Sequence, residues 1–171
     1  IGLGLLAVQA ARMAREGASL DDILKNTQDS VPHTQYFGVV DTLEYLHRGG
    51  RIGKAATLLG SMLNVRPVIG LRNGIAHPIE RVRGRERALS RICELVGSFR
   101  QIRSLAVAHT TSEAEMELFA ARLVQFFPAD QIIHSRCGAT LGTYLGPGAL
   151  TVALISGGPL EVNGEPSIYV T

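Results

Sequence analysis

Two adjacent glycines followed at once by an arginine interrupt a helical pattern in the segment DTLEYLHRGGRIGKAATLLGSMLNVRPVIG, Asp41 to Gly70. Glycines let backbone N–H groups approach a ligand closely, and an arginine offers a fixed fork of donors that suits a carboxylate or a phosphate. Gly49, Gly50 and Arg51 therefore predict an anion site. The same residues also fit a glycine-terminated helix followed by a surface arginine. The surrounding residues lack the order required for a nucleotide-phosphate loop.

A second candidate site is the stretch GTYLGPGAL, residues 142–150. Gly146, Pro147 and Gly148 predict a rigid corner with few side chains, which leaves room for a ligand beside the strand that follows. Tyr144 adds a hydroxyl group on an apolar ring. An ordinary turn is the alternative, and the local pattern alone slightly favours it.

His109 ends an apolar segment that is typical of a buried strand, and ligand sites in α/β proteins often gather at strand ends. A strand end with a purely structural histidine is the alternative. The five histidines show no i, i+4 pair and the two cysteines show no metal-ligand spacing, so we expect no metal site and no cofactor. We find no pairing of a nucleophile with a base, which favours a binding protein over an enzyme.

The composition is that of a globular protein, with 46% apolar residues, 19% charged residues and a net charge of +2 over 171 residues. Tryptophan is absent and arginines such as Arg83 alternate with glutamates, so we expect no nucleic-acid partner. No apolar run is long enough to predict stable membrane insertion. Cys93 and Cys137 lie in apolar runs, as reduced cysteines do in the cytoplasm. The chain begins without methionine inside a helical pattern, which suggests a fragment.

The periodicity of apolar residues predicts an α/β fold with about six strands and helices between them. Ser19, Asp41 and Ser112 each precede a helical pattern and are predicted N-caps. Asn73-Gly74 predicts a hairpin, which would make the sheet mixed rather than parallel. The expected strands span residues 34–40, 64–71, 75–83, 104–110, 131–136 and 149–155. The expected helices span residues 3–13, 20–26, 42–48, 54–63, 86–96 and 113–127, with a glycine-rich connection at 137–148.

Taken together, four segments resemble the DegV family of bacterial lipid-binding proteins: GLGLLAVQAARMAREGASLDDI, VDTLEYLHRGGRIGKAATLLGSMLNVRPVI, ERVRGRERAL and GTYLGPGAL. Their order and approximate spacing agree with the family over almost the whole chain, and the second segment is the specific one. The resemblance implies that the chain is the larger, C-terminal part of a two-domain protein. Residues 1–32 would be a helical remnant of the N-terminal domain or of the interdomain region. Residues 33–171 would form a C-terminal domain with a mixed six-stranded sheet.

The resemblance also implies a function. The family binds one fatty acid between its two domains, and several members present the acyl chain to an ATP-binding fatty acid kinase related to dihydroxyacetone kinases. The protein itself then performs no chemistry. The arginine after the paired glycines belongs to the network around the carboxylate, a position held here by Arg51. Tyr144 stands where the family has a histidine of that network, and Leu145 replaces the usual threonine. The family's carboxylate-binding threonine and serine lie in the N-terminal domain, which this chain does not include.

We therefore expect a cytoplasmic, non-catalytic protein that binds a long-chain fatty acid and has a fatty acid kinase subunit as its partner. Arg51 would pair the carboxylate, Gly49 and Gly50 would allow close approach, and the corner at 146–148 would shape the wall, with His109 nearby. Arg83 is our candidate for docking the partner or contacting the acyl phosphate, although a solvated helix-start face explains it as well. Two alternatives remain: a kinase-like or phosphotransfer enzyme acting on a small ligand, and a structural remnant that pairs with another chain.

Overall fold

A computed structural model of the chain describes residues 1–58, 65–72, 74–157, 161–162 and 165–166. Its centre is a six-stranded sheet with the strand order β3-β2-β1-β6-β4-β5. Neighbouring strands are antiparallel except for β4 and β5, which run parallel. The predicted mixed α/β sheet is therefore confirmed. The strands are β1 (Thr34–Val39), β2 (Val65–Arg72), β3 (Ile75–Arg83), β4 (Ile102–His109), β5 (Ile133–Arg136) and β6 (Leu150–Ser156).

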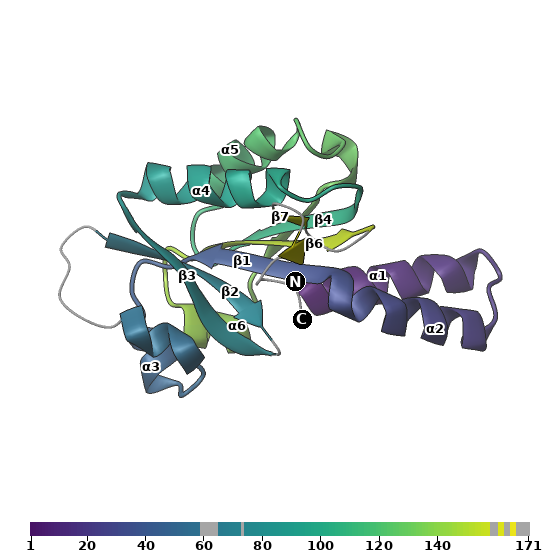
Figure 1. Cartoon of the computed structure of the whole chain (residues 1–171), viewed down its shortest axis with the longest axis horizontal. Coiled ribbons are helices and arrows are strands. Elements are labelled where there is room, and N and C mark those ends of the chain that lie inside the picture. Colours follow the sequence, from purple (N-terminus) through teal and green to yellow (C-terminus); the bar gives the residue numbers. More distant parts are fainter. Residues whose placement is uncertain (59–64, 73, 158–160, 163–164, 167–171) are drawn as a thin grey trace.

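Helices cover both faces of this sheet (Figure 1). Two lie side by side over one face, and the others gather on the opposite face, where α1 and α2 form a hairpin that extends beyond the sheet. The α-helices are α1 (Gly2–Arg15), α2 (Leu20–Ser30), α3 (Glu44–Arg48), α4 (Arg85–Gly97), α5 (Glu113–Leu123) and α6 (Ala139–Leu145). Short 3-10 helices span Val31–His33, Gly53–Leu58 and Ala129–Gln131, and the two-residue strands β7 (Glu161–Val162) and β8 (Glu165–Pro166) pair with each other.

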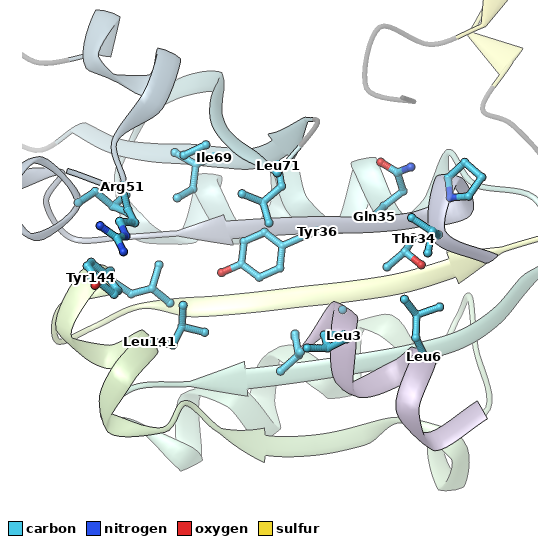
Figure 2. Close-up of a pocket in the computed structure, with 18 residues that line it drawn as sticks. Leu3, Leu6, Thr34, Gln35, Tyr36, Arg51, Ile69, Leu71, Leu141 and Tyr144 are labelled. Atoms are coloured by element: carbon cyan, nitrogen blue, oxygen red, sulfur yellow. The ribbon is translucent and has the colours of Figure 1, made fainter. Parts of the chain in front are cut away.

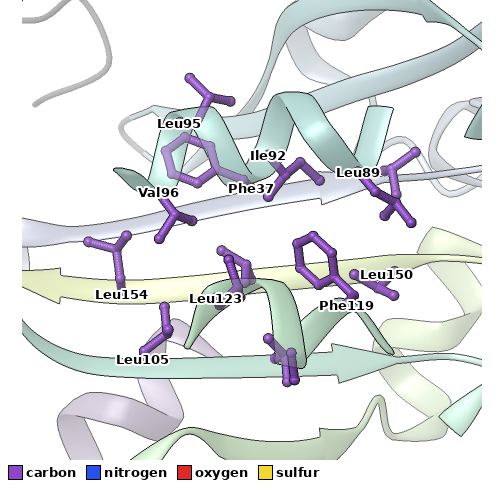
Figure 3. Close-up of a cluster of buried hydrophobic side chains, with 14 of the residues drawn as sticks. Phe37, Leu89, Ile92, Leu95, Val96, Leu105, Phe119, Leu123, Leu150 and Leu154 are labelled. Carbon is purple, nitrogen blue, oxygen red and sulfur yellow. The ribbon is translucent and has the colours of Figure 1, made fainter. Parts of the chain in front are cut away.

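The main core fills the space between the sheet and helices α4 and α5 (Figure 3). Alternate residues of each strand point into it, so Phe37 of β1 packs with Ile92 of α4 and Phe119 of α5. All three side chains are almost completely buried. This core fixes one face of the sheet, which leaves the other face for the remaining helices and for a ligand.

Two predicted N-caps are confirmed and one is wrong. Ser19 and Ser112 each accept a hydrogen bond from a backbone N–H in the first turn of α2 and α5. Asp41 does not cap α3, since that helix begins at Glu44 and it is Thr42 whose hydroxyl accepts the Glu44 N–H. The Asp41 carboxylate instead pairs with arginines from other elements, described below.

Several helices also differ from the prediction. Helix α2 continues to Ser30, four residues beyond the expected end. The helix expected at 54–63 is a 3-10 helix over Gly53–Leu58, and residues 59–64 lie outside the described residues. Helix α5 ends at Leu123, four residues earlier than expected. The glycine-rich connection contains helix α6, so Tyr144 lies on a helix rather than on a loop. The β2–β3 hairpin is confirmed, although Asn73 of its turn lies outside the described residues.

Candidate ligand pocket

A pocket of about 780 Å³ lies on the face of the sheet opposite α4 and α5. It sits between the start of the α1–α2 hairpin and helices α3 and α6 (Figure 2). Its volume falls within the range of about 300–1,000 Å³ that is typical of small-molecule sites. The floor is the strand β1, and most of the wall is aliphatic, formed by Leu3, Leu6, Leu46, Ile69, Leu71, Leu141 and Leu145.

Tyr36 lies at the middle of the floor of this pocket (Figure 2). Its ring faces the pocket, and its hydroxyl lies over the backbone of Gly38, where no side chain intervenes. Burial, reinforced by the nearby Cys137, raises the pKa of the Tyr36 hydroxyl, while a hydrogen bond with Thr151 partly opposes that rise. The phenol therefore stays neutral and presents a flat, mostly apolar surface to whatever fills the pocket.

Arg51 supplies the only charged side chain among the described residues that line the pocket. Its guanidinium carbon lies 5.0 Å from the centre of the Tyr144 ring, a cation–π arrangement. Among the described residues, the guanidinium makes one hydrogen bond, a long one of 3.4 Å from Nη1 to the carbonyl oxygen of Gly49. In the described part of the chain, no carboxylate lies within ion-pair distance of Arg51. Most of its donors are therefore available to an anionic ligand.

The backbone after α3 explains why glycines precede Arg51. Gly49 ends the helix with right-handed dihedral angles, and Gly50 then adopts a φ of +66°. This reversal brings the N–H groups of Arg51 and Ile52 to the carbonyl oxygen of Leu46, each at 3.1 Å. The turn is a glycine-terminated helix end, the alternative explanation that the sequence offered for Gly49 and Gly50, and it also directs Arg51 towards the pocket.

Two glycines, Gly49 and Gly146, allow this turn to pack against helix α6 and the corner after it. A Cβ atom at Gly49 would overlap the ring of Tyr144, and one at Gly146 would overlap the ring of Tyr45. Gly146 also has a φ of +75°, a conformation that side chains disfavour. The two motifs that stand out in the sequence therefore pack against each other, and the contact places Tyr144 beside Arg51.

The remaining predicted site residues lie elsewhere. Pro147 and Gly146 line a second hollow on the other side of α6, together with Thr110 and Arg136. His109 is buried at the end of β4 and follows Leu105 and Val107 on the core side of the sheet, so it is not among the pocket-lining residues. Its Nδ1 atom has no hydrogen-bond partner among the described residues.

Arg83 also lies outside the pocket. It is exposed at the end of β3, and it forms no ion pair with the described residues. Its contribution to partner docking or to an acyl phosphate stays a prediction.

Several pocket residues were not identified from the sequence. Tyr36, Ile69 and Leu141 sit on three different elements, and only the folded sheet brings them together. A partial signal was present, because Tyr36 alternates with Phe37 and so must lie on the face opposite the main core. Leu3 is 81% exposed although it lines the pocket, which marks the pocket as open on the α1 side.

The described residues contain no group of three or more His, Cys, Asp or Glu that could hold a metal ion. Nor does any described helix have the length and apolar character needed to cross a membrane. The fold and the site thus define an α/β protein with a mostly apolar pocket, in which Arg51 is the one charged side chain that the described part of the lining contains.

Comparisons with known proteins agree with this class. The model of the DegV family, described as an uncharacterised protein family, matches residues 1–157, and the chain belongs to this family. A DegV domain-containing protein of Caldanaerobacter subterraneus is 33% identical over 155 residues, which cover 89% of this chain and 55% of the relative. Protein DegV of Bacillus subtilis is 35% identical over 87% of this chain and 54% of its own length. The chain thus spans about half the length of these relatives.

Solved structures of the family show the same fold. The structure of a DegV family protein from Thermus thermophilus, described by its fatty acid binding, superposes with a TM-score of 0.82 at 27% identity. It covers 91% of this chain and 57% of the Thermus protein. DegV of Bacillus subtilis, described as a fatty acid binding protein, superposes with a TM-score of 0.75 at 32% identity, over 91% of this chain and 56% of that protein.

Proposed function

We propose that this protein binds a long-chain fatty acid in the pocket on the β1 face. The carboxylate would pair with Arg51 beside Tyr144. The hydrocarbon chain would run over Tyr36 towards Leu3 and Leu6, which lie at the far end of the pocket in Figure 2. The observation that carries the proposal is a guanidinium at one end of a mostly apolar pocket, with no acidic partner among the described residues.

The energetics favour this kind of ligand. Burial of an acyl chain contributes about 0.8 kcal/mol per methylene, so a long chain supplies most of the affinity. A carboxylate at the same site is costly to bury alone, and a guanidinium fork offsets that cost by paired, charge-assisted hydrogen bonds. Arg51 therefore selects the orientation of the ligand, while the aliphatic wall supplies the binding energy.

We also infer that the protein performs no chemistry itself. Among the described residues that line the pocket there is no Asp, Glu, His, Cys or Lys. Such a lining suits a carrier better than a phosphotransfer enzyme, which would need acidic metal ligands near the reacting group. The bound carboxylate would be presented to a fatty acid kinase subunit, in the cytoplasm, where Cys93 and Cys137 remain free thiols.

Native mass spectrometry of the full-length protein purified from bacteria tests the binding step. We expect a co-purified fatty acid in the wild type and in the control Arg48→Ala. Arg48 belongs to the same turn but is exposed and paired with Glu44. Arg51→Ala should lose most of the ligand, since a lost hydrogen bond to a charged group costs about 1.5–3 kcal/mol, or roughly 10- to 150-fold in affinity. Equal ligand in all three proteins would contradict the proposal.

A second assay tests presentation to a kinase. The protein loaded with fatty acid should yield acyl phosphate only when ATP and the bacterium's fatty acid kinase are both added. ATP turnover by the protein alone would contradict the non-catalytic assignment.

A further inference from the structure

The corner at Gly146–Gly148 is contacted by Asp41, which lies two residues after the end of β1. The Asp41 Oδ1 atom lies 3.2 Å from Nη1 of Arg85 and 3.4 Å from Nε of Arg66. Arg66 also donates to the backbone carbonyl oxygen of Asp41 at 3.1 Å. Arg85 is itself held by two hydrogen bonds of 2.7 Å to the carboxylate of Glu115 in the first turn of α5. The Asp41 carboxylate is therefore paired with two arginines from different elements.

The other carboxylate oxygen of Asp41 occupies the space that a side chain at Gly148 would need. A Cβ atom built on Gly148 would overlap Oδ2 of Asp41, and the φ of Gly148 is +74°. The N–H of Gly148 also donates to Oγ1 of Thr111 at 3.1 Å. Gly148 thus contacts both the Asp41 carboxylate and the Thr111 hydroxyl. The Asp41 contact is possible only because glycine has no side chain.

Tyr45 makes a second contact with the same corner, because its ring covers Gly146 at the start of the corner. Asp41 and Tyr45 lie four residues apart and hold the two ends of Gly146–Gly148. Tyr144 lies just before this corner, in the last turn of α6. Any displacement of the corner would therefore be transmitted to the ring that faces Arg51.

We propose that Asp41 is a positioning residue for the head-group end of the pocket, acting through Gly148 to hold Tyr144 against Arg51. Asp41 is not itself among the residues that line the pocket. The effect of Asp41 on ligand binding rests on the proposed function. The contacts of Asp41 described above are present in the protein without a ligand.

A purely stabilising role explains this network poorly. The Asp41 side chain is 42% exposed, and exposed ion pairs contribute little to stability because water screens them. An acid that receives two arginines and lies against a glycine with a positive φ is arranged to fix a position. Removal of the Asp41 carboxylate should therefore change the local geometry around Tyr144 rather than the free energy of global unfolding.

Nuclear magnetic resonance of the ligand-free, full-length protein tests the positioning directly. The Arg51 Nε–H signal should carry a ring-current shift from Tyr144, identified by its loss in Tyr144→Leu. We expect Asp41→Ala to move the signal in the same direction, and Asp41→Asn, which keeps its shape against Gly148, to move it less. The control Glu86→Ala removes another exposed ion pair, that with Arg122, and should leave the signal unchanged. An unmoved signal in Asp41→Ala would overturn the inference, as would equal movement in Asp41→Asn.

Binding of a C16 fatty acid and of the C16 alcohol separates this inference from the proposed function. Asp41→Ala should lower the preference for the acid about threefold, the scale of a weakened cation–π contact, with the affinity for the alcohol unchanged. A wild-type protein without any preference for the acid would overturn the proposed function alone, since the Arg51 signal would still decide whether Asp41 positions Tyr144. A wild-type preference that Asp41→Ala retains in full would overturn the positioning role alone.

Discussion

The ring of Tyr144 rests directly on Gly49, in the space where any other residue would place its Cβ atom. The same ring lies 5.0 Å from the guanidinium carbon of Arg51. A residue without a side chain thus brings an aromatic ring from α6 to the arginine that follows α3. The glycine pair therefore has two separate tasks, since Gly49 makes room for the ring and Gly50 reverses the backbone.

This division of tasks predicts different effects for the two glycines. Gly49→Ala should displace the Tyr144 ring and weaken acid binding about 3- to 30-fold, because the cation–π contact is worth about 0.5–2 kcal/mol. The matched control is Gly50→Ala, since a Cβ atom at Gly50 meets nothing within 4 Å. Its cost is backbone strain of about 1–2 kcal/mol in stability. Isothermal titration with a C16 acid and thermal unfolding measure the two effects, and equal losses of affinity would contradict the assignment.

The far end of the pocket predicts selectivity for chain length. Leu3→Glu places a charge where the methyl end of a long acyl chain would lie, so it should weaken C18 acids more than C12 acids. Leu20→Glu is a matched control, because Leu20 is 79% exposed against 81% for Leu3 but does not line the pocket. Competition binding with acids of both lengths checks this. A uniform loss of affinity at all lengths would contradict the proposed direction of the chain.

The main core predicts a large stability effect that is independent of the pocket. Phe119 is fully buried between α5 and the sheet, so Phe119→Ala should lower the free energy of unfolding by about 3–5 kcal/mol. The neighbouring Leu118 is 69% exposed, and Leu118→Ala should change the free energy of unfolding by less than about 0.5 kcal/mol. Urea denaturation measures both, and similar values for the two variants would contradict the packing.

Alkaline pH should destabilise the fold. Burial raises the pKa of the Tyr36 hydroxyl and of the Cys93 thiol, so the folded state holds these protons more tightly than the unfolded state does. Their contribution to stability is complete below the pKa values of the unfolded groups, about 8.5 for cysteine and 10 for tyrosine. It is then lost as the pH rises towards the raised values. Urea denaturation between pH 7 and 10.5 should show this decline, and Tyr36→Phe should flatten its upper part. An unchanged slope in that variant would contradict the burial of the hydroxyl.

The sequence was a good guide where local interactions decide the structure. Ser19 and Ser112 cap their helices because the hydroxyl and its backbone N–H lie within one turn of each other. Asp41 failed as a cap because its partners, Arg66 and Arg85, are 25 and 44 residues away and bind the carboxylate more strongly than a helix end does. Helix α6 was missed because Gly142 within it and Gly138 and Gly146 at its ends disfavour a helix in the sequence pattern, and tertiary contacts overcome that cost.

The candidate site shows the same difference between short sequence motifs and long-range contacts. Arg51 and Tyr144 stood out as motif residues, and the structure places them together. The apolar wall could not be assembled from the sequence, since Leu3, Ile69 and Leu141 are ordinary aliphatic residues until the sheet brings them to one face.

A crystal structure of the full-length protein with a bound C16 fatty acid tests the central claim most directly. We expect a carboxylate oxygen within hydrogen-bond distance of the Arg51 guanidinium, about 2.7–3.2 Å, with the hydrocarbon chain lying over Tyr36. A carboxylate bound at the Leu3 end of the pocket, or an Arg51 side chain turned away from the ligand, would contradict it.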